Sequence, residues 1–403
     1  MRLTVLNQFY APDISPTAQL AASLAEHRAE RGDEVTVVTG RAGYLEGLSA
    51  PGPASVGAGV RIRRVWTPDL GKSSRGRRLL GYALFSVGSV ARLLVLPRQD
   101  VIVAMTTPPF VVVAAVVHQL LHRGTRIVLW SMDCYPDAAE RFGELKPDGV
   151  VSRLLRRLNR WTFRRVEVVV GLDGAMADLL GSQYASGPDR PRVTVIPNWE
   201  RRDRFPDPAE AVEPVKPWSG YADIEVGDRT VILYLGNTGV GHQFATVLAA
   251  AEQLGDEALF VFVGGGAQWA ALQDEVRARR LTNVVSRPYV PKDDTPSVMA
   301  GAHVALITLD ERSLGVMSPS KLHANLAAGL PVLYVGPAGS NVDEAIDRHG
   351  VGRSLREGDL TGVVAAVRDL RSDPDAPRRA RRAFDEAYSD TATLPAWDRL
   401  LDG

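Results

Sequence analysis

The sequence predicts an α/β protein made of two doubly wound, Rossmann-like domains, and three observations support this prediction. The chain has 403 residues, which is too long for one ordinary hydrophobic core and favours two. Hydrophobic residues make up 45% of the chain and charged residues 23%, values that are typical of globular proteins. Both halves also repeat a pattern in which a short β-rich run is followed by a turn and a helical stretch.

In the first half this pattern begins with LTVLN at residues 3–7 and a helical stretch that ends at Gly32. Further strands are predicted at residues 34–40, 61–66, 100–106, 126–133, 166–172 and 192–198. Strands that alternate with helices are typical of a parallel sheet. We therefore predict a first domain over residues 1–200.

Residues 201–226 are rich in proline and charge and lack a sustained apolar period, which predicts a linker. The alternation then resumes, with strands predicted at 230–236, 259–266, 283–290, 303–309 and 331–337. A second domain is expected over residues 227–385. Residues 386–403 are expected to return to the first domain.

The composition also excludes several classes of protein. The single cysteine, Cys134, excludes an internal disulfide framework and a cysteine-rich zinc site, and we expect it to be a buried, inert thiol in a reducing cytoplasm. The N-terminus lacks the apolar core of a signal peptide. The longest apolar stretch, 110–117, has roughly half the ~20 residues needed to span a bilayer, so no transmembrane helix is predicted.

Charge is unevenly distributed along the chain. Residues 1–200 contain 25 Lys and Arg against 18 Asp and Glu, whereas the remainder contains 22 against 29. The positive half could face a phospholipid surface or a pyrophosphate-bearing acceptor, although solvated helix faces would explain the same counts. Residues 72–94 and 153–165 combine arginine with apolar positions, which predicts peripheral membrane contact unless their apolar faces pack on the first sheet.

In open α/β sheets, ligands bind beyond the carboxyl ends of the strands, and three loops of the second half follow strands in this way. Residues 236–244, GNTGVGHQF, have three glycines that permit close approach of the backbone to phosphate oxygens. His242 in this loop could donate to a phosphate, or it could be a capping or core residue. Residues 263–268, VGGGAQ, form the second loop, which could equally be a plain tight turn.

The third loop leads into a helix at residues 318–329, SPSKLHANLAAG. Ser318 or Ser320 could cap this helix. Lys321 would then lie in its first turn, where a cation opposes the helix dipole unless an anion lies between them. A diphosphate would supply that anion, and a solvent-exposed lysine is the alternative.

The first half offers the loop 10–19 and a segment with two carboxylates, 130–143. Asp133 and Asp137 flank Tyr135 at the predicted end of a strand. Asp133 could act on an acceptor hydroxyl as a base or an orienting group. Asp137 is expected to cap the next helix.

Seven segments in order resemble the retaining glycosyltransferases of family 4, which have the GT-B fold, and particularly their bacterial polysaccharide and O-antigen branch. They are LNQFYAPDISPTAQLAASLAE, WSMDCYPDAAERFGELKPDGVVSRLL, VIPNW, GNTGVGHQF, FVFVGGGAQ, RPYVP and SPSKLHANLAAGLPVLYVGP. The resemblance covers nearly the whole chain. It implies two facing domains that transfer a sugar from a nucleotide sugar, expected to be a UDP-sugar, to a lipid-linked saccharide or natural-product acceptor held in the cleft between them.

The resemblance also implies where each substrate binds. The implied donor-binding residues are Asn237, Thr238, Gly239, His242, Gly264, Gly265, Arg287, Tyr289, Val290, Ser318, Ser320 and Lys321. The expected acceptor-side residues are Asp13, Ser15, Pro16, Thr17, Asp133 and Tyr135. Asp133 and Lys321 are the catalytic candidates, and no nucleic acid partner is expected.

The resemblance implies that neither a metal ion nor a further cofactor is needed, because the family is generally metal-independent. The one Asp-any-Asp match, Asp373 and Asp375, lies in a C-terminal helical region. Cationic side chains and helix dipoles would therefore stabilise the leaving diphosphate. Retention implies an oxocarbenium-like transition state. The leaving phosphate could then remove the proton of the acceptor on the same face.

The sequence departs from the wider family at three positions. Val316 and Ala324 replace two glutamates that are eight positions apart in the family, and Val240 replaces a usual arginine or lysine. These departures keep an alternative open, a non-catalytic protein that binds a nucleotide sugar or stabilises another transferase. A GT-B epimerase would require inward-facing carboxylates and histidines that the sequence does not identify.

Overall fold

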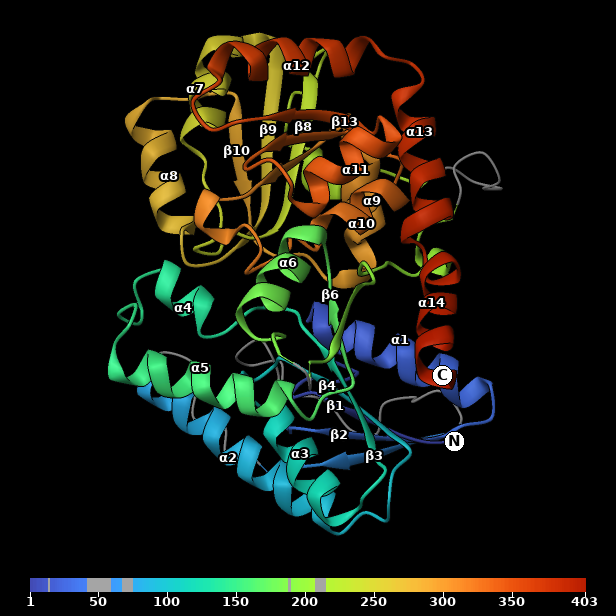
Figure 1. The fold of residues 1–403 in the computed structure, drawn as a ribbon. Helices are drawn as coiled ribbons and strands as arrows, with labels where there is room; N and C mark the ends of the chain where they lie inside the picture. Colours follow the sequence, from blue (N-terminus) through green and yellow to red (C-terminus); the bar gives the residue numbers. More distant parts are fainter. Residues whose placement is uncertain (14, 42–58, 67–74, 188–189, 207–214) are drawn as a thin grey trace. The chain divides into compact units, whose positions relative to one another are not determined.

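The structure is a computed structural model that describes residues 1–13, 15–41, 59–66, 75–187, 190–206 and 215–403. The chain divides into two compact units, shown in Figure 1. Unit 1 contains Met1–Pro197, Gly315–Met317 and Leu394–Gly403, and unit 2 contains Asn198–Leu314 and Ser318–Thr393. Each unit contains a parallel sheet with flanking helices, which confirms the predicted α/β class.

The sheet of unit 1 has seven parallel strands in the order β3-β2-β1-β4-β5-β6-β7. Its strands are β1 (Arg2–Leu6), β2 (Glu34–Thr39), β3 (Val60–Arg64), β4 (Val101–Met105), β5 (Arg126–Trp130), β6 (Val168–Gly171) and β7 (Arg192–Val195). The central strands are rich in β-branched residues that are buried on both faces, as expected for a parallel sheet covered by helices. The strand order reverses between β1 and β4.

The helices of unit 1 connect these strands. They are α1 (Pro16–Glu30), α2 (Arg75–Leu94), α3 (Val112–Leu121), α4 (Asp137–Arg141), α5 (Val150–Phe163) and α6 (Gly174–Gln183). The Ser15 hydroxyl caps α1 by accepting from the Ala18 N–H, and Pro16 supplies a fixed φ at the first helical position. Gly32 has a φ of +90° just beyond α1, where the chain turns into β2.

The last helix, α14 (Asp390–Asp402), packs its C-terminal part within unit 1. Arg28 of α1 is buried, and its guanidinium donates to Asp33, Asp398 and Asp402 at 2.6–2.8 Å. The ring of Trp397 lies 4.5 Å from that of Trp130 in β5, measured between centroids. Charge pairing and aromatic packing thus fix the chain's end on α1 and β5.

The sheet of unit 2 has six parallel strands in the order β10-β9-β8-β11-β12-β13. Its strands are β8 (Thr230–Asn237), β9 (Ala258–Gly265), β10 (Val284–Arg287), β11 (Val304–Thr308), β12 (Val332–Val335) and β13 (Gly352–Leu355). Successive residues face opposite sides, so Val231 and Leu233 of β8 belong to one core, and Ile232 and Tyr234 belong to the other.

The helices of unit 2 cover both of these cores. They are α7 (Ala245–Leu254), α8 (Trp269–Ala278), α9 (Thr295–Ala300), α10 (Lys321–Ala327), α11 (Asn341–His349), α12 (Leu360–Ser372) and α13 (Ala376–Ala383). Helices α7, α8 and α12 supply the core that contains Tyr234, and α9, α10 and α11 supply the other. Within the predicted linker, two short 3₁₀ turns span Arg202–Arg204 and Ser219–Tyr221, and residues 207–214 lie outside the described residues.

Every strand predicted from the sequence forms, with ends shifted by up to three residues. The strand β13 at the edge of the second sheet was not predicted. No helix among the described residues has both the length and the apolarity needed to cross a bilayer.

Candidate functional site

The strand order of unit 2 reverses between β8 and β11, so the connections that leave these two strands diverge. The predicted loops 236–244 and 263–268 contain the last residues of β8 and β9 and the turns that follow them, and residues 287–290 end or follow β10. Helix α10 follows β11. The sheet therefore brings most of the predicted donor residues to the carboxyl edge of its strands, where α/β proteins bind ligands.

Glycine is required at this edge because the ends of β8 and β9, and the loops that follow them, approach each other closely. Gly264 has a φ of +149°, and a Cβ there would lie 2.1 Å from the Gly236 carbonyl oxygen. A Cβ on Gly266, whose φ is +128°, would lie 2.0 Å from Asn237 Oδ1. Packing between the loops thus explains these glycines before any ligand is considered.

Hydrogen bonds lock the two loops together. Thr238 is buried, and its N–H and hydroxyl both donate to the Gly265 carbonyl, at 2.7 and 3.1 Å. The Gln268 amide donates to the carbonyls of Gly239 and His242, both at 2.7 Å. The role of Gln268 was not predicted, because a polar residue after a glycine turn carries no signal for such a contact.

Lys321 is the first residue of α10 and extends its ammonium toward the loop after β8. Its Nζ donates to the Asn237 carbonyl at 3.2 Å and lies 4.8 Å from the centroid of the Tyr234 ring. Among the described residues, no carboxylate forms an ion pair with Lys321. Burial lowers the pKa of Lys321 to about 7.

The predicted capping of α10 by a serine side chain is wrong. Ser320 precedes the helix, but its side chain makes no capping hydrogen bond. The Ser318 hydroxyl is buried and has no partner within the described part of the chain. A serine caps only when its backbone is extended, and Ser320 has helical φ and ψ of −76° and −12°.

His242 lies in the predicted loop, but both of its ring nitrogens already have partners. Nδ1 is 2.7 Å from the Thr308 carbonyl oxygen at the end of β11, and Nε2 is 3.2 Å from Lys321 Nζ. Direct donation from His242 to a phosphate would have to replace one of these contacts, and it stays a prediction. Burial and the Lys321 ammonium lower the pKa of His242 to about 3, so the imidazole is neutral.

The three residues expected near the nucleotide base differ in their contacts and exposure. Arg287 donates to Asp223 at 2.8–2.9 Å, and Tyr289 is 46% exposed. A Cβ on Gly265 would lie 2.8 Å from the Tyr289 ring, so Gly265 leaves room for that ring. Val290 packs against a core of unit 2. Tyr289 is thus the most exposed member of this group.

In unit 1, Asp133 follows β5 and is held through its backbone. The Thr106 hydroxyl, which follows β4, accepts from the N–H groups of Met132 and Asp133 at 2.9 and 3.1 Å. The Asp133 carboxylate has no hydrogen-bond or ion-pair partner among the described residues. Burial raises its pKa to about 6.

The other acceptor-side candidates shape the backbone of unit 1. Asp13 Oδ1 accepts from the Ser15 N–H at 2.7 Å, and Ser15 caps α1, in which Pro16 and Thr17 are the first residues. The Tyr135 carbonyl accepts from the Asn159 amide at 2.6 Å, and burial raises the pKa of the Tyr135 phenol.

The predicted capping role of Asp137 is wrong. Asp137 is the first residue of α4, and its carboxylate accepts from the Tyr184 hydroxyl and pairs with Arg156. A buried tertiary network has taken the place of the local cap. Cys134 is buried, as predicted, and burial raises the pKa of its thiol.

Two of the family departures lie at apolar positions. Val316 is fully buried within unit 1, and Ala324 packs against a core of unit 2 from α10. Val240 is 52% exposed in the loop after β8. A glutamate at the buried position of Val316 would need a partner for its charge.

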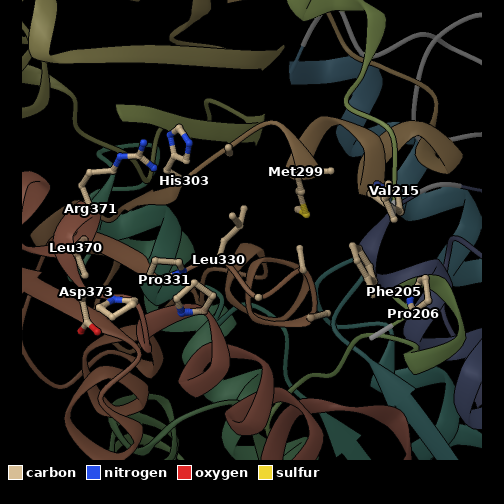
Figure 2. A pocket seen from close by; sticks show the side chains of 18 residues that line it. Phe205, Pro206, Val215, Met299, His303, Leu330, Pro331, Leu370, Arg371 and Asp373 are labelled. Carbon is tan, nitrogen blue, oxygen red and sulfur yellow. The ribbon is translucent and has the colours of Figure 1, made fainter. Parts of the chain in front are cut away.

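A pocket of about 470 Å³ in unit 2 lies away from all of these residues, and Figure 2 shows its lining. His303 precedes β11 and Leu330 and Pro331 precede β12, so the pocket opens at the amino ends of the strands. None of the predicted site residues lines it. Its position is opposite to the edge at which α/β sheets bind nucleotides.

Within the described residues, no three His, Cys, Asp or Glu side chains gather in a way that could hold a metal ion. Asp373 pairs with Arg379, and Asp375 lies beside Arg378. These two aspartates are therefore engaged in ion pairs at the start of α13. Metal independence stays a prediction.

Comparisons with known proteins agree with the resemblance. Residues 17–199 match the model of the glycosyl transferase 4-like domain. WbjE of Pseudomonas aeruginosa, named a probable glycosyltransferase, is 28% identical over 298 residues, or 71% of this chain and 69% of WbjE. WcaI of Escherichia coli K12, named for glycosyl transfer in colanic acid biosynthesis, is 25% identical over 386 residues, or 91% of each chain.

A solved structure supports the fold over the full length. Anabaena HepE, solved in complex with UDP and glucose, has a TM-score of 0.68 at 12% identity and matches over 100% of each chain. Two parallel sheets with flanking helices, the family match and the named relatives lead to the same assignment. The chain is a glycosyltransferase with the GT-B fold, and its residues 17–199 match the glycosyl transferase 4-like domain.

Proposed function

We propose that the chain is a retaining, metal-independent enzyme that transfers a sugar from a UDP-sugar to a lipid-linked saccharide or a natural product. The observation that carries the donor assignment is the Lys321 ammonium, which has no carboxylate partner among the described residues and lies beside the glycine loops. A diphosphate would supply the missing negative charge. The UDP in the HepE structure supports a uridine donor, and the polysaccharide role in WcaI's name supports a saccharide acceptor.

Negative charge develops on the diphosphate as its bond to the sugar breaks. Lys321 and the backbone N–H groups of the loops after β8 and β9 would stabilise that charge without a metal ion or a further cofactor. For retention, a phosphate oxygen removes the proton of the acceptor hydroxyl on the face from which the diphosphate leaves. Asp133 would orient the acceptor hydroxyl.

The donor assignment is tested by incubating the protein with a panel of UDP-sugars and measuring the slow release of UDP, with water as the acceptor. We expect one UDP-sugar to release UDP at the same rate with and without EDTA, because protein cations neutralise the diphosphate. Addition of Mg²⁺ after EDTA is the control for residual metal.

Two outcomes would contradict the proposal in different ways. If the calorimetric affinity for UDP collapses in EDTA, a metal ion holds the diphosphate. If UDP binds but no UDP-sugar is ever hydrolysed, the chain does not transfer from these donors, and the non-catalytic alternative gains support.

We further propose that the enzyme works at the cytoplasmic face of a membrane, which it contacts through α5. Val150, Val151 and Leu154 of this helix are 74%, 55% and 65% exposed, and Arg153 and Arg157 are exposed beside them. Phe163 at the end of α5 is buried, so part of the helix does pack within unit 1. The exposed part combines apolar insertion with attraction to anionic lipids.

Sedimentation with liposomes tests this contact. At low salt, we expect the protein to pellet with phosphatidylglycerol-containing vesicles and much less with phosphatidylcholine vesicles. Each arginine near an anionic surface contributes about 1 kcal/mol, so L154S with R157S should reduce binding by roughly tenfold or more. V195S, at a valine exposed on β7, is the matched control. Absence of wild-type protein from the anionic pellet would contradict the membrane proposal.

A further inference from the structure

Lys321 is held by three uncharged groups, two from β8 and one from the loop that follows it. Its Nζ donates to the Asn237 carbonyl at 3.2 Å, lies 3.2 Å from His242 Nε2 and sits over the Tyr234 ring. Gly236, with a φ of +125°, leaves room for the lysine stem, because a Cβ there would lie 3.2 Å from Lys321 Cε. The ammonium is thus fixed in place, while no counter-ion for it is found within the described part of the chain.

The tautomer of His242 follows from its partners. The Thr308 carbonyl can only accept, so His242 Nδ1 must carry the ring proton. Nε2 then holds a lone pair, and it accepts a hydrogen bond from the Lys321 ammonium. Because His242 follows β8 while Thr308 ends β11, this chain of hydrogen bonds spans the point at which the strand order reverses.

We propose that His242 is a positioning residue that holds the Lys321 ammonium for a nucleoside diphosphate, and that binding of the diphosphate is coupled to uptake of a proton by Lys321. This inference rests on the proposed donor site. An amine that has only neutral acceptors gives up its proton more readily than one in an ion pair. The negative charge of a bound diphosphate would instead favour the protonated amine.

The expected energies support a coupling between UDP binding and proton uptake by Lys321. With a pKa of about 7 for Lys321, about nine in ten free sites would be neutral at pH 8. A negative charge about 4 Å away contributes about 4 kcal/mol at an effective dielectric constant of about 20, enough to restore the ammonium fully. Because the bound state has the higher pKa, UDP affinity should be greatest below pH 7 and should fall as the pH rises through that value.

Other titratable groups near this part of unit 2 do not exchange a proton in the same range. Arg312 lowers the pKa of Asp310 to about 2, and burial lowers that of His323, on α10 itself, to about 4. Burial raises the pKa of the Tyr234 phenol well above its usual value, and Tyr289, beyond β10, is a second phenol. Arg287 is paired with Asp223. Lys321 is therefore the group expected to take up the proton.

The test is calorimetry of UDP binding to the full chain at pH 8 in two buffers with different ionisation enthalpies. We expect the wild type to take up about 0.9 proton per UDP. K321R should bind UDP with almost no uptake, because arginine stays protonated. Subtracting the proton uptake of K321R from that of the wild type removes any contribution from the phosphates of UDP. At pH 6 the difference between the two proteins should fall to about 0.1 proton per UDP.

Variants of His242 test the positioning role. H242F removes the acceptor but keeps a ring, so the pH midpoint of UDP affinity should move about one unit lower. H242Q places an oxygen near the position of Nε2 and should keep the wild-type midpoint. A merely structural role for His242 would change affinity at every pH without moving the midpoint. If H242F unfolds, as judged by circular dichroism, H242L takes its place, because it also lacks an acceptor for the ammonium and should lower the midpoint in the same way.

Each result has a distinct meaning. Tight UDP binding without proton uptake by the wild type would overturn the coupling. A midpoint that is unchanged in H242F, or is shifted in H242Q to the value expected for H242F, would overturn the positioning role. Failure of the folded wild type to bind UDP even at pH 6 would instead contradict the proposed donor site.

Discussion

Replacement of Lys321 by alanine is expected to lower the rate of UDP release from the UDP-sugar by about 10- to 100-fold. A charge-assisted contact to a desolvated anion contributes roughly 1.5–3 kcal/mol. The charge on the diphosphate grows as its bond to the sugar breaks, so the contact strengthens in the transition state. Turnover should therefore fall more than UDP affinity does.

Lys321 is expected to have this effect because the described part of unit 2 offers little else to neutralise a diphosphate beside the glycine loops. Val240 replaces the family's usual cation, and Arg287 is already paired with Asp223. The neighbouring His242 is neutral. The ammonium of Lys321 is thus the main fixed positive charge in contact with the loop after β8.

Two further variants separate charge from packing. K321M keeps the length of the stem over Tyr234 and should lose as much turnover as K321A. K216A removes an exposed lysine of the same unit and should leave turnover unchanged. Burial already disfavours the ammonium, so neither Lys321 variant should unfold more easily than the wild type. Wild-type turnover and UDP affinity in both would show that the diphosphate lies elsewhere.

Sequence patterns predicted the elements whose apolar residues form long runs. The strands β8 and β9 are continuous runs of buried residues, and a covered parallel sheet requires such runs. The edge strand β13, GRSL, was missed because it is short, contains two polar residues and is only partly buried. Its pairing with β12 is a tertiary contact without a local signal.

The candidate site was predictable as a set of loops but not as a set of contacts. Glycines after buried strands marked the loops at 236–244 and 263–268 correctly. The partner that determines the state of His242 is the carbonyl of Thr308, 66 residues away, and no local pattern reports it. Asp137 was assigned a helix cap for the same reason, because its partners are distant in sequence: Arg156 lies in α5 and Tyr184 directly follows α6.

Asp133 combines features that separate a functional carboxylate from a structural one. It follows a central strand of unit 1, its backbone is fixed by Thr106, and its carboxylate has no hydrogen-bond or ion-pair partner among the described residues. Burial without a partner disfavours the ionised form and raises the pKa to about 6. The neighbouring Asp137 has partners and behaves as part of the fold.

Replacement of Asp133 by asparagine is expected to lower UDP release from the UDP-sugar by about 100-fold, as is typical for loss of a general base or an orienting carboxylate. In the wild type the rate should rise with pH through about 6, as Asp133 ionises, and D133N should lack this rise. UDP affinity should not change, because the proposed donor residues belong to unit 2.

The same substitution should stabilise the protein at neutral pH, which a structural aspartate would not allow. The pKa of Asp133 is higher in the folded chain than in the unfolded chain, so the protonated carboxyl favours the folded state. This contribution to stability is intact below about pH 4 and is lost as the pH rises through about 6. At pH 8, D133N should therefore raise the free energy of unfolding by about 1–2 kcal/mol, discounted for partial exposure, and should have little effect at pH 4. D137N is the matched control, because it breaks a buried network and should lower stability by about 2 kcal/mol or more. Denaturant unfolding of the three proteins at both pH values, together with UDP release at pH 8, distinguishes a functional role of Asp133 from a structural one. If D133N is less stable than the wild type at pH 8 and loses activity only in proportion to its unfolded fraction, Asp133 is a structural residue.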